Sequence, residues 1–85
     1  MPYVYLLRCA GGSFYTGWTV DLVARLAAHQ AGKASRYTRA RLPVSLAYWE
    51  ELPTESAARR REPQLKRLSH AAKERLCRQV AAADS

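Results

Sequence analysis

Residues 3–19 read YVYLLRCAGGSFYTGWT, two runs of strand-forming residues on either side of the one pair of adjacent glycines in the chain. Aromatic and β-branched residues favour strands, and glycines allow the tight reversal that joins two antiparallel strands. We therefore predict a β-hairpin with strands over residues 2–9 and 13–19. The glycine at position 17 stands out, because glycine weakens a strand interior unless something must approach the backbone closely.

The register of this hairpin decides whether Tyr5 and Tyr15 share a face, because side chains alternate between the two faces of a sheet. A two-residue turn would send the two tyrosines to opposite faces. A three-residue turn over residues 10–12 pairs Tyr5 with Gly17 and puts both tyrosines on one face. It also needs a left-handed residue, which Gly12 can supply. We predict the three-residue turn, and with it a gap at Gly17 through which a ligand approaches the phenol of Tyr5.

The rest of the chain predicts three helices and one more strand. These elements are a helix over residues 21–31, a loop over 32–43, a strand over 44–52, a helix over 53–68 and a last helix capped by Ser69. In the first helix, the apolar spacing predicts an inner face of Leu22, Val23, Leu26 and Gln30. The β-β-α-β-α-α order has no repeated β-α-β crossover. We therefore expect one α+β domain over residues 1–85, with a three-stranded antiparallel sheet and flanking helices.

The charge of the chain predicts an acidic partner. Its 85 residues include 14 Lys and Arg but only 7 Asp and Glu, for a formal net charge of +7. A chain of this length supports one domain with one modest core, so we expect a single site. Nucleic acid fits this charge better than a membrane, because the basic helices also carry acidic residues and lack a face of large aromatic side chains.

The N-terminal apolar run predicts neither a signal peptide nor a membrane span. It is interrupted at Arg8 and is too short for either. We therefore expect a cytoplasmic protein in which Cys9 and Cys77 are free thiols.

Basic side chains gather in the predicted loop over residues 32–43. Such side chains contact phosphates and give an affinity that falls with salt, but they carry little sequence information. No helix-turn-helix or zinc-finger pattern is present to read base edges. We therefore expect a preference for nucleic-acid structure, such as flaps, branches or single strands. The residues expected to bind nucleic acid are Lys33, Arg36, Tyr37, Arg39, Arg41 and Lys66.

A set of spaced motifs resembles a known family. YVY at residues 3–5, YTG at residues 15–17, Arg25, His29 and REPQLK at residues 61–66 resemble the GIY-YIG nuclease domain, in its small single-domain bacterial subfamily. The resemblance covers nearly the whole chain, and it depends on the spacing of the motifs more than on either tripeptide. It implies a metal-dependent endonuclease that hydrolyses phosphodiester bonds, with its site on one face of the sheet.

The resemblance implies a role for each residue of the candidate site. Either Tyr5 or Tyr15 activates the attacking water, and a phenol with a pKa of about 10 needs a cation to act as a base at neutral pH. Arg25 clamps the scissile phosphate, while His29 moves a proton or binds phosphate. Glu62 binds one hydrated Mg²⁺, with Mn²⁺ as a substitute, because a lone carboxylate cannot form a two-metal site.

The same residues also have a structural interpretation. Two strand tyrosines usually pack in a core with their hydroxyls hydrogen-bonded. Arg25 and His29 fit a surface arginine and a histidine near the end of a helix. Glu62 and Lys66 are spaced for an ion pair on a solvated helix.

We predict a Mg²⁺-dependent endonuclease that prefers particular DNA structures, acts in repair or recombination and is recruited by a protein partner. The alternative is a nucleic-acid-binding module that keeps the fold without turnover. Three features favour the alternative: Pro63 follows Glu62 in the predicted helix, Trp18 stands where some relatives carry a lysine, and the chain has no asparagine. A third hypothesis is a small scaffold whose charge only keeps it in solution.

Overall fold

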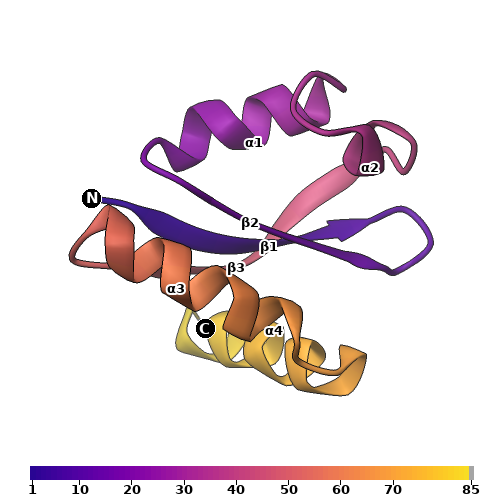
Figure 1. The fold of residues 1–85 in the computed structure, drawn as a ribbon. Coiled ribbons are helices and arrows are strands. Elements are labelled where there is room, and N and C mark those ends of the chain that lie inside the picture. The colour runs from indigo at the N-terminus through magenta and orange to yellow at the C-terminus, as the bar shows by residue number, and fades with distance from the viewer. Residues whose placement is uncertain (85) are drawn as a thin grey trace.

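The first strand of the chain is the central strand of its sheet. The computed structural model describes residues 1–84, with side chains through residue 79. Its strands are β1 (Tyr3–Cys9), β2 (Phe14–Thr19) and β3 (Val44–Glu51). They form one sheet in the order β2-β1-β3, and both pairings are antiparallel (Figure 1). The predicted α+β fold with a three-stranded antiparallel sheet is therefore confirmed.

The turn between β1 and β2 has the predicted three-residue form. Tyr5 lies opposite Gly17 across the hairpin. Gly11 and Gly12 have φ angles of 89° and 92°, a conformation that glycine adopts without a Cβ clash. Tyr5 and Tyr15 consequently pack in the same core cluster, on one face of the sheet.

The helices cover both faces of this sheet. They are α1 (Leu22–Gln30), α2 (Arg36–Arg39), α3 (Glu55–Lys66) and α4 (His70–Asp84). In Figure 1, α1 and α2 lie on one side of the sheet, and α3 and α4 lie on the other. The hairpin therefore presents one face of its alternating side chains to α1 and the opposite face to α3.

The core under α1 differs from its predicted inner face at two residues, because Val23 and Gln30 are both exposed. Leu22 and Leu26 pack on the cluster, but Val23 is 80% exposed, so its predicted inward position was wrong. The third inward residue is His29, which is completely buried. Leu22, Leu26 and His29 follow an i, i+4, i+7 stripe, and Val23 lies one residue off that stripe. The buried cluster on this face comprises Tyr5, Leu7, Cys9 and Val44.

Helix α2 interrupts the segment predicted as a loop over residues 32–43. It is a single turn, so the prediction of an entirely irregular segment was wrong there. Ser35 caps the turn by accepting a hydrogen bond from the backbone N–H of Thr38 at 3.3 Å. A serine N-cap satisfies an otherwise unpaired donor, and here it stabilises a turn too short to show helical periodicity.

Helix α3 covers the opposite face of the hairpin. Thr54 caps its start by accepting from the N–H of Ala57 at 3.1 Å, and the helix continues through Pro63 to Lys66. Pro63 has no backbone N–H, so the carbonyl one turn earlier loses its usual helical hydrogen bond. Because Pro63 lies in the last turn, this loss costs less free energy than it would in the interior of a long helix. The buried cluster on this face comprises Val4, Ala58 and Leu65.

Helix α4 is attached to the hairpin by two polar contacts. Arg8 of β1 donates both guanidinium N–H groups to Glu74, and the ring of His70 lies 2.9 Å from the carbonyl oxygen of Gly12. Within residues 1–84, no helix has the length and apolar character needed to cross a membrane.

Candidate functional site

Gly17 makes room for the phenol of Tyr5. A Cβ atom at position 17 would lie 2.6 Å from the Tyr5 hydroxyl oxygen and 2.7 Å from Cζ, closer than real Cβ atoms approach other groups. The predicted close approach at Gly17 is therefore present, but the group that approaches is Tyr5. The predicted gap for a ligand at this point was wrong, because the phenol of Tyr5 fills it.

Tyr5 and His29 form a buried hydrogen-bonded pair. The Tyr5 hydroxyl lies 2.9 Å from His29 Nε2, and only 2% of Tyr5 is exposed. Burial is the main cause that raises the pKa of Tyr5 far above 10, and the proximity of Tyr15 and the charge of Glu62 raise it further. Burial, followed by the positive charge of Arg25, lowers the pKa of His29 below its usual 6.5. At neutral pH the pair is therefore a neutral phenol next to a neutral imidazole.

His29 makes a second buried contact on the other side of its ring. Its Nδ1 atom lies 2.9 Å from Thr38 Oγ1 in α2, and Thr38 is completely buried. The imidazole thus bridges β1 and α2 through both of its nitrogens. The sequence gives no sign of this role, because Thr38 is one of three hydroxyl residues in the segment 35–39.

Tyr15 lies nearer to solvent than Tyr5. Its ring is half-buried and lies with its centroid 5.0 Å from that of His29 and 5.9 Å from that of Tyr37. The two candidate tyrosines are therefore close to the same histidine, but they differ in their surroundings. Tyr5 is the one hydrogen-bonded to the imidazole, and Tyr15 extends the aromatic surface towards α2.

Arg25 stands at the exposed edge of this cluster. It lies one turn before His29 on α1, exposed where His29 is buried. Its charge lowers the pKa of Tyr5 and that of His29, which places the guanidinium within electrostatic reach of both. Among the described side chains, no carboxylate forms a salt bridge with Arg25. The guanidinium can therefore receive an anion without breaking an ion pair.

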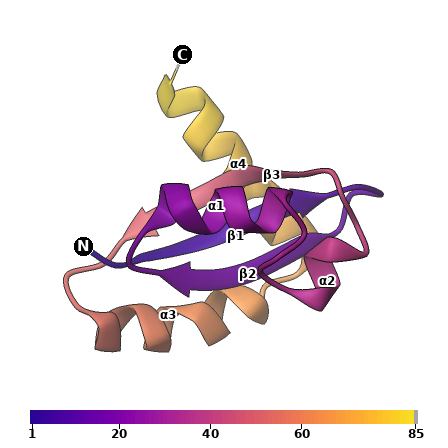
Figure 2. The ribbon, with the colours of Figure 1, turned by 90° about the horizontal axis from the view of Figure 1, so that it is seen from above.

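Glu62 lies on α3, on the opposite side of the sheet from α1 (Figure 1). Helix α3 packs on β2 and runs beside that edge strand (Figure 2). From there the negative charge of Glu62 raises the pKa of Tyr5. Its carboxylate also forms the ion pair that helix spacing suggested, with Lys66 Nζ at 3.3 Å from Oε1. Lys66, expected to bind nucleic acid, is thus paired with Glu62.

Over the described residues, Glu62 offers a single carboxylate and not a preformed metal site. Within the part of the chain that the structure describes, no group of three or more His, Cys, Asp or Glu side chains is arranged to hold a metal. Mg²⁺ commonly uses one or two carboxylates and fills its other positions with water and substrate phosphate. Glu62 is 23% exposed and its partner Lys66 is 59% exposed, so the carboxylate is accessible and Lys66 can move aside.

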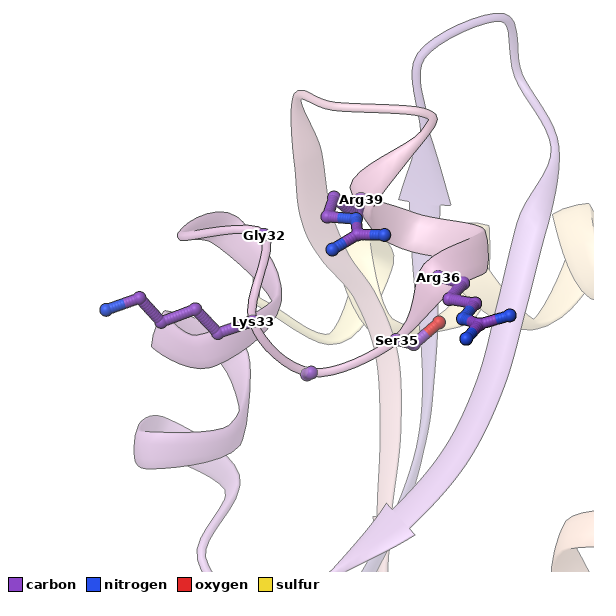
Figure 3. A pocket seen from close by; sticks show the side chains of 6 residues that line it. Gly32, Lys33, Ser35, Arg36 and Arg39 are labelled. Atoms are coloured by element: carbon purple, nitrogen blue, oxygen red, sulfur yellow. The ribbon is translucent and has the colours of Figure 1, made fainter.

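The basic residues after α1 form a spread surface with a shallow hollow. The hollow has a volume of about 470 Å³ and lies between the end of α1 and α2. The head groups of Lys33 and Arg36 point in opposite directions, with Arg39 between them (Figure 3). Such a spread suits successive phosphates better than one enclosed anion. The lining residues are Gly32, Lys33, Ala34, Ser35, Arg36 and Arg39.

Arg41 and Tyr37 form a stacked pair beside this surface. The Arg41 guanidinium lies 3.8 Å from the centroid of the Tyr37 ring and donates to the Tyr37 carbonyl at 3.0 Å. Tyr37 is also the neighbour of Tyr15. The predicted nucleic-acid-binding residues therefore continue, through Tyr37, up to the tyrosine and histidine cluster.

Comparison with known proteins gives consistent matches. A family model described as the GIY-YIG catalytic domain matches residues 1–75. The UPF0213 protein of Streptococcus sanguinis is 54% identical over 71 residues, which cover 84% of this chain and 82% of that protein. The UPF0213 protein of Halobacterium salinarum is 46% identical over 76 residues, which cover 89% of this chain and 99% of the relative. The solution NMR structure of the UPF0213 protein from Bacillus halodurans matches with 43% identity and a TM-score of 0.55, covering 89% of this chain and 82% of that one.

Proposed function

The chain belongs to the GIY-YIG catalytic domain family, and from this premise we propose that it is a metal-dependent endonuclease that hydrolyses phosphodiester bonds. The observation that carries the proposal is the buried hydrogen bond between Tyr5 and His29. The charges of Arg25 and Glu62 both act on the same phenol, although they come from helices on opposite faces of the sheet. The proposal is that this phenol, the imidazole, Arg25 and Glu62 act together on one phosphate.

Tyr5 takes the proton of the attacking water and passes its own to His29. Because burial raises the pKa of Tyr5, a free phenolate would be costly. A second proton transfer avoids this cost: as the water proton moves to the phenol oxygen, the phenol proton moves to His29 Nε2. The water oxygen forms a bond to phosphorus, the bond from phosphorus to the leaving oxygen breaks, and that oxygen takes a proton from solvent. The low pKa of His29 keeps the imidazole neutral and ready to accept.

Arg25 holds the scissile phosphate beside Tyr5. A guanidinium can donate two parallel hydrogen bonds to phosphate oxygens, and it stabilises the charge that develops on them in the transition state. Glu62 would hold a Mg²⁺ or Mn²⁺ ion, which when bound supplies further charge stabilisation at the phosphate oxygens. The carboxylate oxygen of Glu62 is a suitable hard ligand for either ion.

The substrate that fits best is DNA with a branch, flap or single-stranded segment. The spread of basic heads after α1 supports contacts with successive phosphates, which give affinity without reading sequence. Tyr37, with Arg41 stacked on its ring, offers an aromatic surface for an unpaired base. A role in repair or recombination, in the cytoplasm and with a recruiting protein partner, accords with such a substrate.

The test is a cleavage panel with pure protein. Branched, single-stranded and duplex DNA are incubated with Mg²⁺, Mn²⁺ or EDTA, for the wild type and for Glu62→Gln. We expect metal-dependent cleavage that Glu62→Gln abolishes. Glu55→Gln is a matched control, because Glu55 forms the same kind of i, i+4 pair, with Arg59, on the same helix. Cleavage that survives in EDTA or in Glu62→Gln would contradict the proposal.

The ion pair between Glu62 and Lys66 favours a second candidate function, a nucleic-acid-binding module without turnover. In that case Glu62 only stabilises its own helix, and Glu62→Gln leaves the affinity for DNA unchanged. Salt-sensitive binding of branched DNA by the wild type, with no cleavage under any metal condition, would support this second function over the first.

A further inference from the structure

The hydrogen bonds around Thr38 fix the position of a proton on His29. Thr38 Oγ1 lies 3.3 Å from the carbonyl oxygen of Ser35 and 2.9 Å from His29 Nδ1. The Ser35 carbonyl, which also accepts from the N–H of Arg39 at 3.0 Å, can only accept, so when Thr38 bonds both groups at once its single hydroxyl proton is directed to Ser35. Thr38 Oγ1 then acts as an acceptor towards the imidazole, and Nδ1 must carry a proton to donate to it.

The position of the His29 proton also determines the direction of the hydrogen bond between His29 and Tyr5. A neutral imidazole with its proton on Nδ1 has a lone pair on Nε2. Nε2 is the atom that lies 2.9 Å from the Tyr5 hydroxyl, so the Tyr5 O–H is the donor of that bond. The complete chain runs from Tyr5 to His29, from His29 to Thr38 and from Thr38 to the carbonyl of Ser35, with every donor directed the same way.

We infer that Thr38 is a positioning residue that holds His29 in the Nδ1–H tautomer, so that Nε2 is free to receive the proton of Tyr5. Without this acceptor, the imidazole could place its proton on Nε2 and the ring could rotate. Either change would remove the proton acceptor from Tyr5. This inference deepens the proposed function and, in its catalytic part, rests on it.

The local structure of α2 explains how Thr38 is held in place. The Ser35 side chain caps the turn at the N–H of Thr38, and the Ser35 carbonyl accepts from the Thr38 hydroxyl. Thr38 is thus bound to Ser35 through both its backbone and its side chain. The same turn carries Arg36 and Arg39, so the element that holds the histidine also lies among the expected phosphate contacts.

NMR of the imidazole nitrogens tests the inference without any substrate. The ¹⁵N shifts of a neutral histidine distinguish the two tautomers, and the two histidines of the chain should give opposite answers. We expect the Nδ1–H tautomer for His29 and the Nε2–H tautomer for neutral His70, whose Nε2 lies 2.9 Å from the Gly12 carbonyl oxygen. An Nε2–H tautomer for His29 in the wild type would overturn the inference.

Two variants test whether the hydroxyl of Thr38 or only its shape matters for the His29 tautomer. Thr38→Val keeps the branched side chain without an acceptor, so the His29 signals should shift towards the other tautomer, while Thr38→Ser should keep the wild-type pattern. Thr16→Val is a matched control, because Thr16 is also a buried threonine but lies in β2 and not in α2. An unchanged His29 tautomer in Thr38→Val would contradict the inference, and if that variant does not fold, the wild-type and Thr38→Ser spectra decide.

Cleavage kinetics test the inferred effect of Thr38 on catalysis. Thr38→Val should lower kcat by between about 10-fold and 100-fold, the usual cost of removing the group that orients a functional histidine, while KM stays unchanged. Thr38→Ser should restore most of the rate. Equal kcat in Thr38→Val and the wild type would overturn this part. If the wild type cleaves nothing, the proposed function fails, and the NMR spectra still decide whether Thr38 fixes the tautomer.

Discussion

The two faces of the sheet are both covered by helices, yet their buried side chains differ in kind. On the α1 face, Tyr5, His29 and Thr38 form a line of buried hydrogen bonds. On the α3 face, the buried cluster is apolar and includes Val4 and Leu65. Adjacent residues of one strand thus belong to different clusters: Val4 to an apolar core, and Tyr5 to the polar cluster for which we propose a catalytic role.

The polar face is the more demanding one to build. A buried polar group costs free energy unless it is hydrogen-bonded. Throughout the described side chains, every buried nitrogen and oxygen atom has a partner. The α1 face therefore buries polar groups and satisfies each of them with a hydrogen bond. An apolar core of the same size would need no such pairing. Substitutions on the two faces should accordingly separate activity from stability.

The largest expected effect is the loss of activity in Tyr5→Phe. The substitution removes the hydroxyl that passes a proton to His29, so the cleavage rate should fall by between about 10²-fold and 10⁴-fold, the usual contribution of general acid–base catalysis. Tyr48→Phe is the control on the other face, since Tyr48 donates its hydroxyl to Glu50. Steady-state cleavage measures both. Equal losses in the two variants would remove the distinction between the faces.

Leu65→Ala should instead reduce stability and leave the chemistry intact. Leu65 is completely buried under the sheet, and the cavity left by its truncation should lower the free energy of unfolding by roughly 2 to 5 kcal/mol. Urea unfolding gives the stability, and kcat normalised to the folded fraction gives the activity. A large fall in normalised kcat would show that the two faces are not independent.

Gly17→Ala should affect both properties, because Gly17 borders the two tyrosines. The new methyl group would lie 2.6 Å from the Tyr5 hydroxyl oxygen, so the phenol must move away from His29. We expect a loss of roughly 1 to 3 kcal/mol in the free energy of unfolding, typical of overpacking, with lower cleavage. A crystal structure of the variant checks the displacement. An unmoved Tyr5 with full activity would contradict the account of Gly17.

The smallest effect concerns the ion pair that joins α3 to β3. Arg61 lies 2.9 Å from Glu50, and its hydrogen bond is the main cause that lowers the pKa of Glu50 below 4.5. The stabilisation is therefore fully present above about pH 4.5 and is lost as the pH falls through the lowered pKa of Glu50. Arg61→Gln should cost at most about 1 kcal/mol at pH 7, because the pair is partly exposed.

The measurement for this pair is urea unfolding of the wild type and Arg61→Gln across the acid range. The difference in the free energy of unfolding should shrink as the pH falls. Arg59→Gln, which removes a more exposed pair with Glu55, is the control and should show a smaller difference at every pH. A difference between wild type and Arg61→Gln that grows in acid would contradict this account.

The sequence predicted the fold and the hairpin register because both depend on local signals. The glycines of the turn determine its length, and the turn length determines that Tyr5 lies opposite Gly17. The helix cap at Ser69 was also readable, since a serine before a helical segment is a local signal, and its hydroxyl accepts from the N–H of Ala72 at 3.1 Å. These features need no knowledge of which distant segments meet.

The interior of the site could not be predicted in the same way. His29 is buried because it meets Tyr5, which lies 24 residues away in the sequence, and the margin of a helix face gives no sign of such a partner. Thr38 lies in a turn of four residues, too short for a helical period. The gap at Gly17 was assigned to a ligand because the rotamer of Tyr5 is not visible in a sequence.

The central claim is that side chains from both faces meet around one divalent cation, and paramagnetic broadening by Mn²⁺ tests it most directly. We predict that substoichiometric Mn²⁺ broadens the NMR signals of Tyr5, Tyr15 and His29, leaves those of His70 sharp, and loses this effect in Glu62→Gln. Broadening centred away from the tyrosines, or unchanged in Glu62→Gln, would contradict the claim.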